Sequence, residues 1–171
     1  MVRNLVAAAL IVAALVLQVG LVNRVSPRIG PDLVLLVVLS LAALRGGAVP
    51  GAVIGFCGGL AYDLLPPSDH ALGQWALVMC VLGYLAGRAG GQLPLLVVAL
   101  CAVVAPGLAS GIGALLGDPG VTWSVLRSAW PKVAVCNLLL APVVLWVVRA
   151  VQPRRRARGS EFVTGYGRGT A

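Results

Sequence analysis

The chain alternates long apolar blocks with short segments rich in glycine, proline or charge. Strands of a membrane barrel would show alternating hydrophobicity, whereas residues 34–39 form a continuous apolar run. Backbone groups in lipid must be paired within their own segment, which makes helices the default. We therefore predict an all-α membrane protein with about six transmembrane helices, at residues 4–23, 31–45, 48–65, 71–89, 93–116 and 130–149.

Glycine and proline mark the joints between these helices. Gly46-Gly47 leaves almost no loop between helices 31–45 and 48–65, which predicts a tight hairpin. Helix 31–45 would be about 22 Å long at about 1.5 Å per residue, short of a bilayer core of about 30 Å. It is therefore either a partial span or a helix in a thinned bilayer.

Three further prolines affect the last two helices. Pro131 suits the start of helix 130–149, where its missing N–H costs little. Pro106 and Pro142 lie inside helices and predict kinks, because each removes one backbone hydrogen bond.

Composition supports the membrane assignment. Hydrophobic residues make up 60% of the chain and charged residues 11%, with a mean hydropathy of +0.99. Soluble proteins carry about 25% charged residues. We predict one transmembrane domain at residues 1–150 and a basic, disordered cytoplasmic tail at 151–171. The first apolar segment has the character of a signal peptide, but no A-x-A pattern follows it, so we expect it to stay as a helix.

The basic residues predict the orientation. The formal charge is +8, and the basic residues stand mostly alone between apolar blocks, which argues against nucleic-acid binding. With six spans, both termini lie on one side of the membrane, and that side holds nine arginines: Arg3, Arg45, Arg88, Arg149, Arg154, Arg155, Arg156, Arg158 and Arg168. The other side holds Arg24, Arg28, Arg127 and Lys132. This excess predicts cytoplasmic termini, with Arg154, Arg155 and Arg156 contacting anionic lipids.

Glycines recur at every fourth position in the helix 48–65. The row starts just before the helix and comprises Gly47, Gly51, Gly55 and Gly59; a second row is Gly83, Gly87 and Gly91. A glycine face lets another helix backbone approach closely. Two interpretations stay open, namely packing within the chain and docking of a partner's helix.

Two carboxylates stand at predicted helix ends. Asp32 follows Pro31 in the first turn of the helix 31–45, where a carboxylate can cap the helix and suits its dipole. Asp63 ends the helix 48–65. It either reaches the lipid headgroups or pairs with a basic or amide group that fixes the following turn, or with a partner.

Other polar positions predict structural roles. Arg45 and Arg88 end their helices as topology anchors, with the Arg88 side chain extending to the membrane surface. Gln18 and Asn137 lie within helices, where we expect one interhelical hydrogen bond each. Residues 121–132, with tryptophans seven apart, predict either an interfacial amphipathic turn or a loop with aromatic anchors.

Signatures of catalysis are missing from the sequence. It has no P-loop and no G-x-S-x-G, and a single histidine, His70, cannot form a metal cluster. The four cysteines, one in each of four apolar segments, form no CxxC pair and are interpreted as small apolar residues. We expect no enzymatic activity, cofactor or metal.

Several motifs follow one another in a fixed order along the chain. They are Pro31-Asp32-Leu33-Val34-Leu35-Leu36, Arg45-Gly46-Gly47, the stretch from Gly51 to Leu64 ending in Tyr62-Asp63-Leu64, Leu72-Gly73, and Leu82-Gly83-Tyr84-Leu85-Ala86-Gly87-Arg88. In this order and spacing, over residues 1–150, they resemble the rod shape-determining protein MreD family. Gly51, Gly55, Gly59 and Asp63 occupy the family's glycine helix. Residues 118, 123–130 and the tail lie outside the pattern.

The resemblance implies a non-enzymatic scaffold of the bacterial cell-elongation machinery in the inner membrane. It implies binding to the single-span protein MreC and, through it, a link between MreB filaments and peptidoglycan synthesis. It also implies a fold similar to the substrate-binding membrane components of energy-coupling-factor vitamin transporters.

Two other functions remain as alternatives. A vitamin-binding transporter component would need a pocket lined by polar groups, and Ala9 and Ala13 could then dock its coupling subunit. A lipid-precursor flippase would need buried charges in a cavity. The helices contain few such groups, so the scaffold is the interpretation that the sequence favours.

Overall fold

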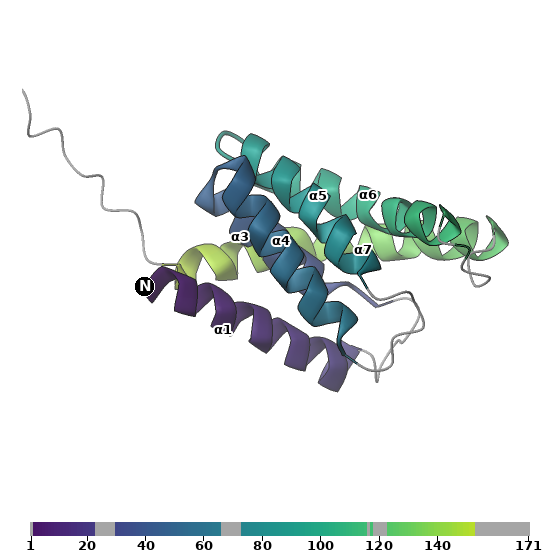
Figure 1. Ribbon diagram of the computed structural model, residues 1–171, viewed down its shortest axis with the longest axis horizontal. Coiled ribbons are helices and arrows are strands. Elements are labelled where there is room, and N and C mark those ends of the chain that lie inside the picture. Colours follow the sequence, from purple (N-terminus) through teal and green to yellow (C-terminus); the bar gives the residue numbers. More distant parts are fainter. Residues whose placement is uncertain (1, 23–29, 66–72, 116, 118–122, 153–171) are drawn as a thin grey trace, which may run out of the picture.

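The computed structural model describes residues 2–22, 30–65, 73–115, 117 and 123–152. Over these ranges the protein is all helical (Figure 1). The elements are α1 (Val2–Leu17), the π-helical turn η1 (Gln18–Val22), α3 (Leu33–Arg45), α4 (Ala48–Asp63), α5 (Gln74–Ala89), α6 (Pro94–Leu115) and α7 (Trp123–Val151). Within the described part of the chain there are thus six α-helices and no strand.

Three of the helices are long and apolar enough to cross a membrane. These segments are Arg3–Gly20, Pro94–Leu115 and Trp130–Val151, while Leu33–Arg45 and Ala48–Asp63 are shorter apolar helices. The prediction of an all-α membrane protein with six helices is confirmed. The six helices are not of equal length, since they range from 13 residues in α3 to 29 in α7.

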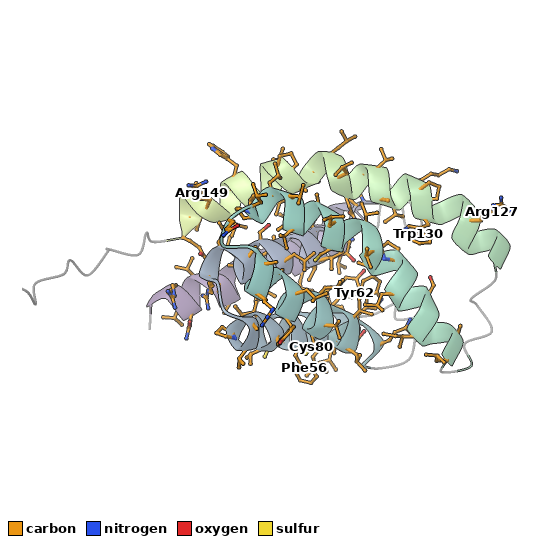
Figure 2. The ribbon with its side chains drawn as sticks, turned by 90° about the horizontal axis from the view of Figure 1, so that it is seen from above. Phe56, Tyr62, Cys80, Arg127, Trp130 and Arg149 are labelled. Carbon is orange, nitrogen blue, oxygen red and sulfur yellow. The ribbon has the colours of Figure 1, made fainter. Side chains whose placement is uncertain are left out.

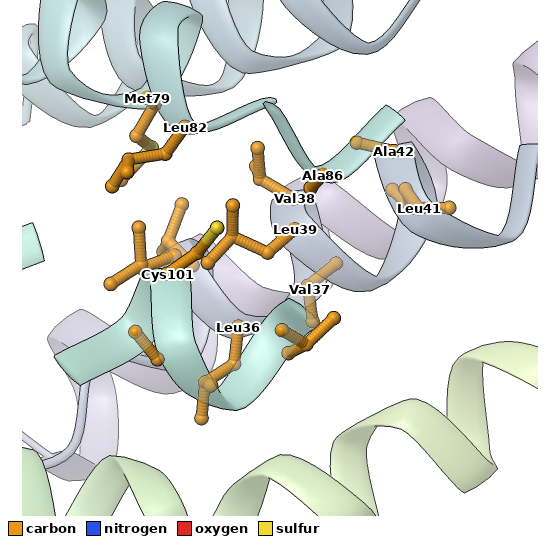
Figure 3. Packing of buried hydrophobic residues seen from close by; sticks show 14 of the residues in the cluster. Leu36, Val37, Val38, Leu39, Leu41, Ala42, Met79, Leu82, Ala86 and Cys101 are labelled. Atoms are coloured by element: carbon orange, nitrogen blue, oxygen red, sulfur yellow. The ribbon is translucent and has the colours of Figure 1, made fainter. Parts of the chain in front are cut away.

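The short helix α3 is the centre of the bundle. Ten of its 13 residues are buried, and it packs against α1, α4, α5, α6 and α7. A helix that is apolar on all sides belongs in an interior. Figure 3 shows side chains of α3 packed with Met79 and Leu82 of α5 and Cys101 of α6. Because other helices surround α3, it needs less length than a helix that faces lipid.

Glycines join α4 to α5 at backbone contact. A Cβ atom added to Gly55 would lie 2.0 Å from the Met79 carbonyl oxygen, and one added to Gly51 would lie 2.2 Å from that of Gly83. On the opposite helix, a Cβ at Gly87 would lie 2.3 Å from the Gly47 carbonyl oxygen. We call this contact, formed by Gly47, Gly51, Gly55, Gly59, Gly83 and Gly87, the glycine seam.

The turn between α3 and α4 consists of Gly46 and Gly47. Their φ angles are 67° and 94°, in the region that side chains disfavour. The Gly47 N–H donates to the Gly87 carbonyl oxygen at 2.8 Å, so the turn is also fastened to the end of α5. The predicted tight connection is confirmed.

The start of the last helix was wrongly predicted. The helix α7 begins at Trp123, so the described residues of segment 121–132 are helical and do not form a loop, while their position at the membrane interface stays a prediction. Pro131 lies inside this helix instead of at its start. The segment's low hydropathy does not mark a break in the helix, because the helix extends beyond its apolar span. Both α6 and α7 continue through Pro106 and Pro142, where kinks stay a prediction.

The glycine seam predicts a position-dependent response to a single methyl group. Gly55→Ala should lower the free energy of unfolding by about 1–3 kcal/mol or more, because the methyl group meets backbone that cannot move aside. Gly111→Ala is the matched control, since this exposed glycine of α6 has no atom within 4 Å of an added Cβ. Thermal unfolding in detergent, followed by circular dichroism, measures both. Equal midpoints for the two variants would contradict the seam.

Candidate functional site

Buried polar groups gather where α3 begins. Asp32 caps the helix: its Oδ1 accepts the Leu35 N–H at 3.0 Å. The carboxylate belongs to a residue that is only 7% exposed. The prediction of a simple helix cap at Asp32 is confirmed, and its burial shows that the cap lies inside the bundle.

Two other helices reach the same backbone segment. Gln18 of η1 accepts the Leu33 N–H at 2.8 Å through Oε1 and donates to the Pro31 carbonyl oxygen at 3.3 Å through Nε2. Asn137 of α7 accepts the Asp32 N–H at 2.8 Å. The expected hydrogen bonds of Gln18 and Asn137 are confirmed, and both hold the start of α3. This segment is therefore fixed by the first and last helices of the bundle.

Asp63 performs the corresponding task for α5 from the end of α4. Its Oδ2 accepts the N–H groups of Gly73 and Ala76 at 3.0 Å each, and its Oδ1 accepts that of Trp75 at 3.3 Å. The residue is 1% exposed. Of the interpretations left open by the sequence, this geometry is that of a carboxylate pairing with amide groups that fix the α4–α5 turn. A carboxylate is well placed there because it meets the positive end of the α5 dipole.

Together these contacts define what we call the capped end of the bundle, formed by Gln18, Asp32, Asp63 and Asn137. Tyr62 adds an edge-to-face contact with Trp75, with ring centroids 5.4 Å apart. At the capped end, the oxygen of each of these four side chains accepts a hydrogen bond from backbone N–H at a helix start. These hydrogen bonds hold the starts of α3 and α5 in place.

Two buried polar atoms near the capped end have no hydrogen-bond partner among the described residues, Nδ2 of Asn137 and Oε1 of Gln74. Gln74 also donates to the Ala109 carbonyl oxygen at 2.7 Å, which ties the start of α5 to α6. Sequence reasoning missed this residue. A glutamine within an apolar block was the available signal, as it was for Gln18.

Trp130 was predicted as a surface anchor but makes a specific contact. Its indole N–H donates to the Val103 carbonyl oxygen at 2.8 Å, and its ring lies against Gly107 of α6. Trp130 and Arg127 appear toward the same end of α7 in Figure 2. The contact joins α6 to α7 at the first residue of the predicted helix 130–149.

The opposite end of the bundle carries the arginines that close the helices. Arg45 donates through Nη1 to the Asn4 side chain at 3.1 Å and through Nη2 to the Arg3 carbonyl oxygen, which ties α3 to the start of α1. Arg88 and Arg149 are exposed at the ends of α5 and α7. We call this end the arginine end. Arg154, Arg155 and Arg156 lie outside the described residues.

The glycine rows lie between α4 and α5. Gly51, Gly55 and Gly59 face α5, and Gly83 and Gly87 face α4, so the structure brings the two predicted rows together. Gly91 has no atom within 4 Å of an added Cβ and stands outside the seam. This geometry is that of packing within the chain, and the α4 glycine face is already covered.

The cap at Asp63 predicts a difference between two substitutions. Asp63→Ala should lower the free energy of unfolding by about 1–3 kcal/mol, because the N–H groups of Gly73, which is part-buried, and Ala76, which is buried, lose their acceptor. Asp63→Asn keeps an oxygen acceptor of the same shape and should lose clearly less. Thermal unfolding midpoints of the two variants in one detergent make the comparison. An alanine variant as stable as the asparagine variant would show that the cap contributes nothing.

Comparison with known proteins identifies the family. The sequence profile described as rod shape-determining protein MreD matches residues 1–152, nearly the whole chain. No curated protein and no solved structure matched the chain significantly. The match covers every described helix, including the seam and the capped end. The chain therefore belongs to the MreD family of rod shape-determining proteins.

Proposed function

We propose that this protein is a non-enzymatic scaffold of the cell-elongation machinery in the bacterial inner membrane. In this role it crosses the membrane several times, with both termini in the cytoplasm, and binds an MreC-like single-span protein. Through that partner it connects with MreB filaments inside and peptidoglycan synthases outside. The family match over residues 1–152 is the observation that carries the proposal.

The use of the buried polar groups supports a positioning role. Gln18, Asp32, Asp63 and Asn137 all bind backbone at the starts of α3 and α5. An enzyme or a vitamin-binding component needs polar groups that converge on a substrate. Here the oxygens of these side chains already accept hydrogen bonds from the protein's own helices. Such a bundle supplies a defined surface on which a partner can bind.

Because α5 already covers the glycine face of α4, we expect a partner's helix to dock on another helix. The helix α1 lies at the periphery, and its main tertiary contact is with α3 (Figure 1). Its inner face buries Ala7, Ala14 and Leu15, while Ala9 and Ala13 are exposed one turn apart on the outside. Small residues at this spacing allow a second helix to approach closely in a membrane. We propose that the partner's helix packs against this outer face of α1.

A vitamin-transporter component could use the same pair, Ala9 and Ala13, to dock its coupling subunit. The scaffold and the transporter component are therefore distinguished by what the protein binds. An MreC-like helix indicates the scaffold, whereas tight binding of a small vitamin, measured by calorimetry, would indicate the transporter component.

The proposed dock predicts the effect of a bulky residue on α1. Ala13→Leu should reduce the amount of an MreC-like protein that co-purifies about tenfold, since it separates the two helix backbones and removes about 1.4 kcal/mol of binding free energy. Ala150→Leu, an exposed alanine near the end of α7, is the matched control and should leave recovery unchanged.

Two results would contradict parts of this proposal. Equal recovery with Ala13→Leu and wild type, at equal thermal midpoints, would exclude the α1 face as the dock. Failure of the wild-type protein to retain any MreC-like protein would contradict the scaffold role itself. Co-expression in one membrane, with both proteins quantified after detergent extraction, provides the measurement.

A further inference from the structure

The outer helices of the bundle differ in apolar length. The helices α4 and α5 have 16 residues each, and α6 and α7 have 22 and 29. At about 1.5 Å per residue, α4 and α5 are about 24 Å long, whereas the apolar spans Pro94–Leu115 of α6 and Trp130–Val151 of α7 have 22 residues each and are about 33 Å long. The hydrocarbon core of a typical bilayer is about 30 Å thick. The α4–α5 side of the protein therefore falls short of the bilayer core, whereas the α6–α7 side is long enough to span it.

The short side presents a continuous apolar surface. The outward row of α4 consists of Val49, Val53, Phe56, Leu60 and Leu64. The outward row of α5 consists of Leu77, Val81, Tyr84 and Leu85. Figure 2 shows Phe56 and Cys80 on the side of the molecule away from α7. We call these two rows the α4–α5 face.

The apolar length of this face is fixed at both ends. At the arginine end, Gly47 bonds to Gly87, and the exposed Arg88 follows one turn after the end of the α5 row. At the capped end, Asp63 bonds to the first N–H groups of α5. The two helices are held in register by the seam, so neither can slide to lengthen the face. Tilting the pair would only shorten its projection along the membrane normal.

The kind of side chain on the face indicates what covers it. Helices that pack together in membranes use small residues at their contact, and in this hairpin those residues point inward to the seam. The outer face instead carries large side chains such as Phe56, Leu60 and Leu77, of which 48%, 39% and 53% of the surface is exposed. Arg88 adds a guanidinium group at the edge of the apolar row, suited to a phosphate headgroup. Phospholipid matches this combination better than a second helix does.

We propose that the α4–α5 face is a lipid-binding surface that favours a locally thinned bilayer, with Arg88 contacting the headgroups at its edge. A hydrophobic surface shorter than the bilayer core is accommodated by thinning of the lipid next to it. Because α6 and α7 are long, thinning is confined to one side of the protein. The inference depends on insertion of the six helices in a membrane and goes beyond the scaffold role.

The test compares the lipids that touch the two sides. A variant with Cys80, Cys101 and Cys136 replaced by alanine keeps the exposed Cys57 of α4 for a fluorescent label. A second variant lacks all four cysteines and carries Leu139→Cys on the exposed face of α7. Both proteins are reconstituted in mixtures of a short-chain brominated phosphatidylcholine (myristoleoyl) and an unbrominated long-chain one (erucoyl). Bromine quenches the label on contact, so quenching reports the local share of the short lipid.

We expect stronger quenching at Cys57 than at Leu139→Cys, corresponding to at least a twofold preference for the short lipid on the α4–α5 face. Arg88→Leu, which extends the apolar row of α5, should reduce this preference, whereas Arg149→Leu at the end of α7 should leave the Cys57 signal unchanged. Equal quenching at the two labels would overturn the proposal. So would the absence of quenching at Cys57 even in the pure brominated lipid, which would show that a second copy covers the face.

This measurement uses the purified protein without any partner. Loss of MreC-like binding in the co-purification experiment would therefore leave the lipid result intact, and a failed lipid result would leave the scaffold role intact.

Discussion

The architecture depends on backbone-to-backbone contact between α4 and α5. Five glycines remove the side chains from the two facing surfaces, and the carbonyl oxygens of one helix, that of Gly47 included, occupy the space of the missing Cβ atoms on the other. In lipid there is no hydrophobic effect to press helices together, so close van der Waals packing must supply the association. The seam also sets the register of the two helices. That register brings Asp63 to the first N–H groups of α5 and Gly47 to the carbonyl of Gly87.

The capped end supplies hydrogen-bond acceptors for the N–H groups at the buried starts of two helices. A helix start has N–H groups without partners, and leaving them unpaired away from water costs free energy. The starts of α3 and α5 receive carboxylate caps from Asp32 and Asp63, and Gln18 and Asn137 satisfy the remaining backbone groups at α3. These four polar residues are therefore explained by the geometry of helix starts.

Sequence patterns predicted the parts of this structure that local chemistry controls. The helices, the Gly46-Gly47 turn, the Asp32 cap and the hydrogen bonds of Gln18 and Asn137 follow from hydrophobic blocks, backbone freedom and the cost of unpaired polar groups. The pairing of the two glycine rows could not be decided, because a glycine face fits a helix of the same chain or of a partner equally well. The start of α7 was misplaced because hydropathy measures membrane depth, whereas the helix continues beyond its apolar span. The contact of Trp130 with the Val103 carbonyl depends on tertiary structure and left no local signal.

The positions of small residues distinguish a surface of this protein that suits lipid from one that suits a partner's helix. The glycines of the seam lie between α4 and α5. The outward face of this hairpin therefore carries large side chains that lipid can surround. On α1 the arrangement is reversed, because Ala7 and Ala14 pack inward but Ala9 and Ala13 also remain on the outside. A helix from another protein gains close contact only where small residues are exposed. The physics that assembles the bundle therefore also favours α1 over the α4–α5 face as the place where a partner's helix would bind.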